Sequence, residues 1–137
     1  MWGRVGTAKT MSFLAQSTEL GELEIVDVYE FYDRPLLFSC INALGIHYLV
    51  VLADVDDETE TWLYASVSPA RLQDVRSGGV DLHDAFGLTE DQTIFVVRQG
   101  RTDSCLKEIN RVACESLIED WLPSPGAILR LVQVGTA

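Results

Sequence analysis

Four consecutive segments of β-type residues, between Leu20 and Val67, constrain the fold of this chain more than any other feature. The segments are residues 23–33, 34–42, 46–55 and 59–67. Val, Ile, Leu, Tyr and Phe dominate them, and such side chains suit a pleated, half-buried surface. The junctions at Asp33-Arg34-Pro35 and Asn42-Ala43-Leu44-Gly45 have the composition of turns. The pattern therefore predicts antiparallel strands joined by short connections.

The next segment, residues 69–77, has the signals of a short helix. Ser68 is a suitable N-cap, and Pro69 fits the first helical position because no backbone donor is needed there. Leu72 and Val75 fall on one face of this helix, so we expect them to pack on the sheet.

The C-terminal half is less regular. Residues 93–99 and 127–134 read as strands, and residues 80–86 read as a turn-like segment with Asp81 as its cap. Residues 104–118 fit two patterns, because their apolar residues recur at helical spacing while part of the segment also alternates as in a strand. Periodicity alone slightly favours the helix.

The chain has 137 residues, of which 47% are hydrophobic, and this is the size and composition of one domain with its own core. Residues 1–19 are small and polar and are interpreted as a flexible leader, with Met11 as an alternative start. Residues 20–137 are predicted to form a single α+β domain. We expect a mainly antiparallel, twisted sheet of about six or seven strands with one short helix packed on it.

The net charge of −11 restricts the partners of the chain. Phosphate backbones and anionic membranes repel such a surface, so we expect neither nucleic-acid nor membrane binding. The charge allows a basic protein partner and would accelerate encounter with it, but solubility alone also explains an acidic surface. A homo-oligomer is compatible with this charge. Three cysteines without a close pair, and an N-terminus that does not read as a signal peptide, predict a cytoplasmic protein.

Two stretches resemble ligand-binding motifs but do not complete them. The acidic run 54–60 matches a calcium loop at its first positions, yet Thr59 and Ala65 stand where the loop needs Gly and Glu. Residues 3–10 resemble a P-loop, but no strand precedes them and no helical pattern follows. We interpret the acidic run as a solvated hairpin turn and predict neither a metal nor a cofactor.

The sequence also gives little support for a catalytic site. A predicted hairpin would bring Cys40 into the neighbourhood of His47, but such proximity is common by chance, and a small buried thiol is the more common role for such a cysteine. His83 lies between Asp81 and Asp84, which would hold its tautomer and raise its pKa. No second acid or base is placed by spacing, so no mechanism follows, and we expect a protein that is not an enzyme.

A candidate interaction surface can still be selected from residue types that anchor protein contacts. Its members are the aromatic and charged residues of the 30–35 corner, the two arginines of the predicted helix, and the polar or aromatic residues that follow it. They are Tyr32, Asp33, Arg34, Arg71, Arg76, Asp81, His83 and Trp121.

Three stretches in collinear order carry a resemblance: "LGELEIVDVYEFYDRPLLFSC", "SVSPARLQDVRSGGVDLHDAF" and "DWLPSPG". Together they resemble an uncharacterised bacterial family, domain of unknown function 6575. The resemblance implies a bacterial cytoplasmic protein and carries over no activity or catalytic residue. It also implies a strand at 105–112, against the periodicity, and we adopt that strand.

The leading functional hypothesis is therefore a non-catalytic protein-interaction or accessory module of a bacterial operon. The first alternative is a small-molecule-binding or hydrolytic domain that uses the Tyr32–Arg34 corner and His83. The second alternative is a mimic of nucleic-acid charge, which would need carboxylates gathered on one face.

Overall fold

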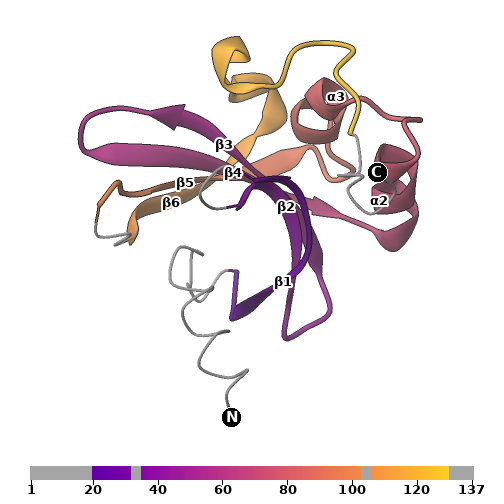
Figure 1. Cartoon of the computed structure of the whole chain (residues 1–137), viewed down its shortest axis with the longest axis horizontal. Helices are drawn as coiled ribbons and strands as arrows, with labels where there is room; N and C mark the ends of the chain where they lie inside the picture. The colour runs from indigo at the N-terminus through magenta and orange to yellow at the C-terminus, as the bar shows by residue number, and fades with distance from the viewer. Residues whose placement is uncertain (1–19, 32–34, 103–105, 130–137) are drawn as a thin grey trace.

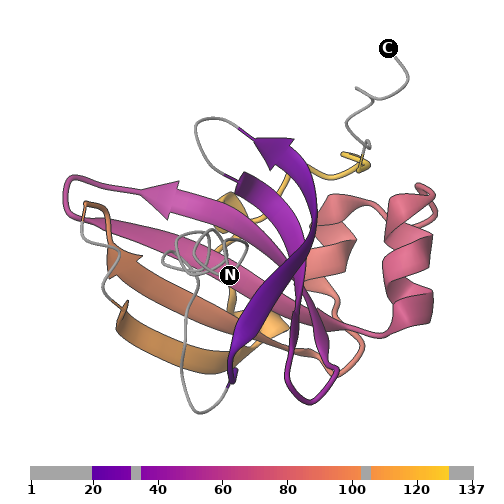
Figure 2. The ribbon, with the colours of Figure 1, turned by 60° about the horizontal axis from the view of Figure 1, so that its bottom comes forward.

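The computed structural model describes residues 20–31, 35–102 and 106–129. In this part of the chain six strands form one antiparallel sheet in the order β1-β2-β3-β4-β5-β6, so that each strand pairs with its neighbours in sequence (Figure 1). The strands are β1 (Leu23–Phe31), β2 (Pro35–Asn42), β3 (His47–Val55), β4 (Thr59–Val67), β5 (Thr93–Gly100) and β6 (Leu106–Ala113). The sheet is strongly twisted and curled (Figure 2).

Side chains of the turns fix the register of two hairpins. The Asn42 side-chain oxygen accepts hydrogen bonds from the backbone N–H groups of Leu44 and Ile46, both at 2.9 Å, and closes the β2–β3 turn. In the β3–β4 turn, Asp56 accepts from the backbone N–H groups of Glu58 and Thr59 at 3.0 and 2.7 Å. Such Asx turns replace missing backbone partners, and so they hold the chain reversal in one geometry.

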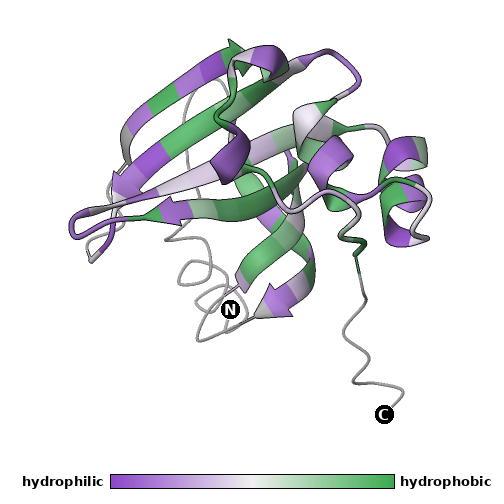
Figure 3. Ribbon diagram, turned by 90° about the horizontal axis from the view of Figure 1, so that it is seen from above, coloured by the Kyte–Doolittle hydropathy of each residue, from purple (hydrophilic) through white to green (hydrophobic). Residues whose placement is uncertain are grey.

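Both faces of the sheet are buried, and each has its own core. Alternation along β4 sends Leu63 and Ala65 to one face and Trp62 and Tyr64 to the other. The helix-side core consists of Tyr29, Leu37, Leu49, Leu63, Ala65, Val67, Leu72, Val75, Leu82, Ala85, Phe86, Ile94, Cys114 and Leu129. The aromatic core consists of Leu20, Leu23, Phe38, Cys40, Tyr48, Val50, Trp62, Tyr64, Phe95 and Val97. Figure 3 shows hydrophobic residues along several strands and hydrophilic residues toward the hairpin tips.

Two helices, α2 (Pro69–Arg76) and α3 (Leu82–Gly87), lie side by side on one side of the sheet (Figure 1). The hydroxyl of Ser68 accepts from the backbone N–H of Arg71 at 3.1 Å and caps α2, while Leu72 and Val75 are the buried residues of that helix. Fully burying one such aliphatic side chain stabilises the fold by about 1.5–3 kcal/mol. Beyond β6 the chain forms two short 3-10 helices, η2 (Cys114–Ser116) and η3 (Glu119–Trp121).

The predicted fold class is confirmed: the domain is α+β, with an antiparallel sheet and a short helix on it. The strand expected at 105–112 is also confirmed as β6, so the helical periodicity of 104–118 was misleading. Residues 80–86 differ from the turn-like segment expected there, because α3 begins at Leu82 with Asp81 as its N-cap. Of the strand expected at 127–134, residues 127–129 lie in no strand, and the rest lies outside the described residues.

Glu60 corrects the interpretation of the acidic run as fully solvated. Asp54, Asp56, Asp57 and Glu58 are exposed, but Glu60 is already part of β4 and only 1% of its surface is exposed. Its carboxylate accepts a hydrogen bond from the indole N–H of Trp62 at 3.2 Å. The reason is geometric: one residue beyond the turn, strand alternation directs the side chain onto the aromatic face.

Candidate functional site

Four residues of the predicted interaction surface lie around α3, where they connect elements of the fold. Arg71 is the first. One nitrogen of its guanidinium, Nη2, donates to the backbone carbonyls of Asp84 and Leu88 at 3.2 and 2.5 Å. These carbonyls lie at the C-terminal end of α3, where helices leave carbonyls unsatisfied and favour a cation. Arg71 therefore ties α2 to the end of α3.

Asp81 holds the opposite end of α3. Its carboxylate accepts from the backbone N–H of Asp84 at 2.8 Å, as an N-cap, and from the backbone N–H of Gly126 at 2.7 Å. These two hydrogen bonds favour the charged carboxylate and lower the pKa of Asp81. The backbone N–H of Leu82 donates to Ala127 at 2.6 Å, so the C-terminal segment is attached to α3 at two points.

His83 connects α3 to η3. Its Nε2 lies 2.6 Å from Glu119 Oε2, and its Nδ1 lies 3.4 Å from Asp84 Oδ1. The hydrogen bond to Glu119 is the largest influence, and it raises the pKa of His83. Trp121, in the same 3-10 helix as Glu119, is half-buried and packs against the helix-side core. His83, Glu119 and Trp121 together attach the C-terminal segment to the helix side of the fold. Each imidazole nitrogen of His83 lies beside a carboxylate oxygen.

The remaining residues of that surface lie elsewhere. Arg76 forms an ion pair of 3.6 Å with Asp27, which joins the end of α2 to β1. Tyr32, Asp33 and Arg34 lie outside the described residues, so nothing is concluded about the corner that they were predicted to form.

The Cys40–His47 pair considered as a catalytic couple does not form. In the β2–β3 register Cys40 is paired with Tyr48, and His47 is paired with Ile41, which places the thiol and the imidazole on opposite faces. Burial in the aromatic core raises the pKa of Cys40 to about 12, so it is a protonated, inert thiol at neutral pH. Within the described residues no group of three or more His, Cys, Asp or Glu side chains is arranged to hold a metal ion.

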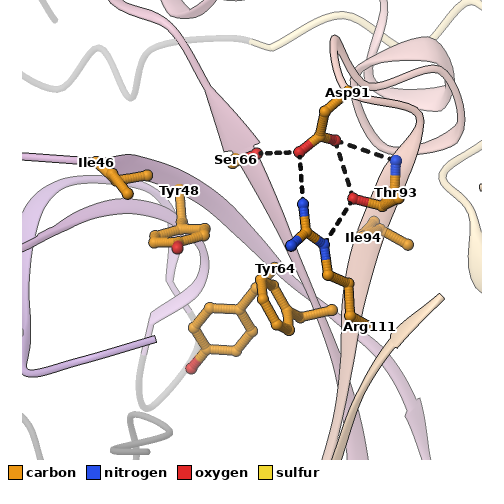
Figure 4. Close-up of a pocket in the computed structure, with 9 residues that line it drawn as sticks. Ile46, Tyr48, Tyr64, Ser66, Asp91, Thr93, Ile94 and Arg111 are labelled. Carbon is orange, nitrogen blue, oxygen red and sulfur yellow. Dashed lines mark hydrogen bonds and ion pairs between the residues drawn. The ribbon is translucent and has the colours of Figure 1, made fainter. Parts of the chain in front are cut away.

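A pocket opens at the edge of the aromatic core, and sequence reasoning missed it (Figure 4). It has a volume of about 230 Å³. Strands β3 to β6, the β2–β3 turn and the turn before β5 contribute to its walls. The lining residues are Ile46, Tyr48, Tyr64, Ser66, Asp91, Thr93, Ile94, Phe95 and Arg111.

Asp91 organises the polar side of this pocket. One carboxylate oxygen, Oδ1, accepts from the backbone N–H of Thr93 at 3.0 Å and from the hydroxyls of Thr93 and Thr89 at 3.1 and 3.2 Å. The other, Oδ2, accepts from Ser66 at 3.4 Å and from Arg111 at 3.3 Å. Burial alone would raise the pKa of Asp91, but these hydrogen bonds outweigh it and lower the pKa. Asp91 is therefore a fixed negative charge at neutral pH.

Arg111 is held in one orientation by this network. Its Nε donates to the Thr93 hydroxyl at 3.0 Å, its Nη2 pairs with Asp91, and its Cζ lies 5.7 Å from the centre of the Phe95 ring. The third nitrogen, Nη1, makes no hydrogen bond with the described residues, and Figure 4 shows it on the side of the guanidinium that faces Tyr48. An oriented N–H donor that has no acceptor among the described residues can bind a carbonyl or carboxylate oxygen.

Aromatic rings form the opposite wall. Tyr48 packs edge-to-face on Tyr64 and on Phe95, with ring centres 6.5 and 6.2 Å apart. Burial is the main reason that the pKa of Tyr48 is raised, so its hydroxyl stays protonated and remains a donor. The pocket thus combines aromatic walls with the Tyr48 hydroxyl and the oriented guanidinium of Arg111.

Comparison with known proteins places the chain in a family without assigning it an activity. The model of a family described as "Family of unknown function (DUF6575)" matches residues 11–134, so the chain belongs to this family. This confirms the family that the sequence motifs suggested. No curated protein and no solved structure matches the chain. Among the described residues, no helix has both the length and the apolar character required to cross a membrane.

Proposed function

We propose that this protein is a non-catalytic protein-interaction module, and that its contact surface is formed by the β2–β3 turn and the adjoining pocket. The observation that carries the proposal is a pair of exposed apolar side chains beside a small aromatic pocket. Leu44 is 84% exposed and Ile46 is 40% exposed, and Ile46 also lines the pocket. Tyrosine and arginine, the residues that most often anchor protein contacts, form the walls behind them.

The size of the pocket supports a protein partner over a small molecule. Sites for drug-sized molecules occupy about 300–1,000 Å³. The pocket here, at about 230 Å³, fits one inserted side chain. A side chain from a partner would contact Tyr48 and Tyr64, while Arg111 Nη1 would donate to a neighbouring backbone carbonyl.

The chemistry of the pocket supports binding rather than catalysis. Asp91 has a lowered pKa and several fixed hydrogen bonds, so it is poorly suited to exchange protons near neutral pH. Ser66 donates to that same carboxylate. His83, the titratable group that a hydrolytic site would have used, is held by Glu119 and Asp84. The hydrolytic and charge-mimic alternatives remain predictions with weaker support.

The charge of the chain indicates the kind of partner. A net charge of −11 accelerates encounter with a basic protein through long-range attraction. We therefore propose a basic cytoplasmic protein that presents an apolar or aromatic side chain to the pocket.

Affinity purification of tagged variants from the native host tests this proposal. The test variants are Leu44→Ser and Ile46→Ser, and the matched control is Val55→Ser, because Val55 is also 40% exposed but lies at the end of β3 that leads into the other hairpin turn. We expect a stoichiometric partner with the wild type and the control, and about tenfold weaker binding by each test variant, as for loss of a hot-spot contact. Recovery of no stoichiometric partner, or equal recovery by all variants, would overturn the proposal.

A further inference from the structure

A second pocket lies where the end of α3, the turn before β5 and the start of η2 meet. Its volume of about 400 Å³ falls within the range of about 300–1,000 Å³ that is typical of ligand sites. The lining residues are Gly87, Leu88, Thr89, Gln92, Ala113, Cys114 and Glu115. It shares no lining residue with the pocket beside the β2–β3 turn, so its occupant is independent of the proposed contact surface.

Leu88 forms an apolar wall of this second pocket, although 64% of the residue is exposed. Its backbone is held on both sides. The N–H of Leu88 donates to the carbonyl of Asp84 at 2.8 Å, and its carbonyl accepts from Arg71 Nη2 at 2.5 Å. Leu88 therefore presents an exposed leucine on a constrained backbone, and a preorganised group loses less entropy when a partner covers it.

The turn on the other side of the pocket is strained. Gln92 has a φ of 65°, in the left-handed region that residues other than glycine seldom adopt. Two backbone hydrogen bonds hold it there, because its N–H donates to the Thr89 carbonyl at 3.1 Å and its carbonyl accepts from the Cys114 N–H at 3.0 Å. Strained residues of this kind cluster at binding sites, where they preorganise the contact geometry. Both sides of the pocket thus have a backbone held in one conformation.

Charge complementarity identifies the occupant. Glu115 lines the pocket and is exposed, and no cation among the described residues pairs with its carboxylate. Asp84 and Glu119 add negative charge around α3, with side chains that are 48% and 70% exposed. A basic segment is attracted to such a surface, and an acidic one is repelled. A lysine or arginine fits best, because its methylene stem can lie on Leu88 while its cation reaches Glu115.

We propose that this second pocket binds a segment of a partner protein in which a lysine or arginine adjoins an apolar residue. The basic side chain enters the pocket and pairs with Glu115. The apolar neighbour packs on the exposed side of Leu88, so the contact combines apolar burial with an ion pair.

Selection from a random peptide library displayed on phage, with the full-length protein as bait, tests this proposal. We expect the enriched peptides to carry a lysine or arginine next to an apolar residue. The affinity of the synthesised peptides should fall about tenfold with Leu88→Ser and with Glu115→Gln, as for loss of a hot-spot contact.

Two control variants match these changes in exposure and in charge. Ile118→Ser replaces an apolar residue that is 52% exposed and does not line the pocket. Glu24→Gln removes one exposed carboxylate from β1, at the opposite edge of the sheet from β6. Both controls should bind the peptides as the wild type does. All four substituted side chains are exposed, so the urea midpoints should stay close to that of the wild type.

Several outcomes would overturn the proposal. They are the absence of enriched peptides, enrichment of acidic or uncharged peptides, and equal loss of affinity in Glu24→Gln, which would show attraction by net charge alone. Peptides that lose affinity with Leu44→Ser but not with Leu88→Ser would also overturn it, and they would support the surface beside the β2–β3 turn instead. The two proposals can therefore fail separately.

Discussion

The two faces of the sheet are both buried but are built differently. The helix-side core is mainly aliphatic and is covered by α2, α3 and the C-terminal segment. The aromatic core is rich in large rings and opens at one edge into a pocket. A polar cluster borders each: His83 with Glu119 beside the helices, and Asp91 with Arg111 at the pocket. The comparison shows that the helices and the C-terminal segment cover one face, while the other face opens into a pocket, which we propose as a contact surface.

The largest expected effect tests whether both faces are genuine cores. Phe86 on the helix side and Phe38 on the aromatic side are each fully buried. Phe86→Ala and Phe38→Ala should each lower the free energy of unfolding by about 3–5 kcal/mol, because each leaves a cavity that the surroundings fill incompletely. Urea denaturation measures both. A loss below about 1 kcal/mol for Phe38→Ala would show that the aromatic face is a surface rather than a core.

An intermediate effect is expected at the pocket. Asp91→Asn removes a charged acceptor from several hydrogen bonds, so we expect a loss of about 1–2 kcal/mol at pH 7. Because the folded-state pKa of Asp91 is lowered, its contribution is present above the unfolded value and is lost as the pH falls through the folded value. The urea midpoints of the wild type and the variant, measured from pH 2.5 to 7, should therefore approach each other as the pH falls below about 4. A difference that stays constant over this range would argue against a charged role.

The smallest effect on the free energy of unfolding is expected for His83→Gln, beside the helices. Its pH dependence is opposite to that of Asp91→Asn. The pKa of His83 is raised above its ordinary 6.5, so its advantage over His83→Gln is present below pH 6.5 and disappears as the pH rises through the folded value. Both partners are partly exposed, so we expect less than about 1 kcal/mol. Urea midpoints from pH 5 to 9 measure it, and Glu119→Gln should remove the same pH dependence. An advantage of the wild type that grows above pH 7 would contradict this assignment.

Local patterns predicted most of the sheet because each strand carries its own signal. The bounds of β1 to β4 lie within about two residues of the expected segments, since turn residues such as Asn42 and Gly45 mark the strand ends directly. Segment 104–118 was ambiguous because its apolar residues fit both periods. Pairing of Ile109 with Val97 and of Val112 with Ile94 places β6 beside β5, and this is a tertiary contact.

The pocket was harder to predict than the sheet. Asp91 and Arg111 are twenty positions apart, and no local pattern connects them. They meet because the β5–β6 register places Arg111 opposite Phe95, and Asp91 lies in the turn that directly precedes β5. The sequence did contain a weak signal, since Asp91 followed by Thr93 is a typical side-chain-to-backbone turn.

The sequence by itself determined strands β1 to β5, the capped helix α2, the acidic character and the family, because propensity, capping and charge are properties of neighbouring residues. Only the tertiary structure decided that Glu60 is buried, that His83 binds Glu119, and that tyrosines and an arginine from different strands form one pocket. Those outcomes depend on strand register and on which face each residue occupies. A shift of one residue reverses the face, and the chain fixes that choice only when the whole sheet is assembled.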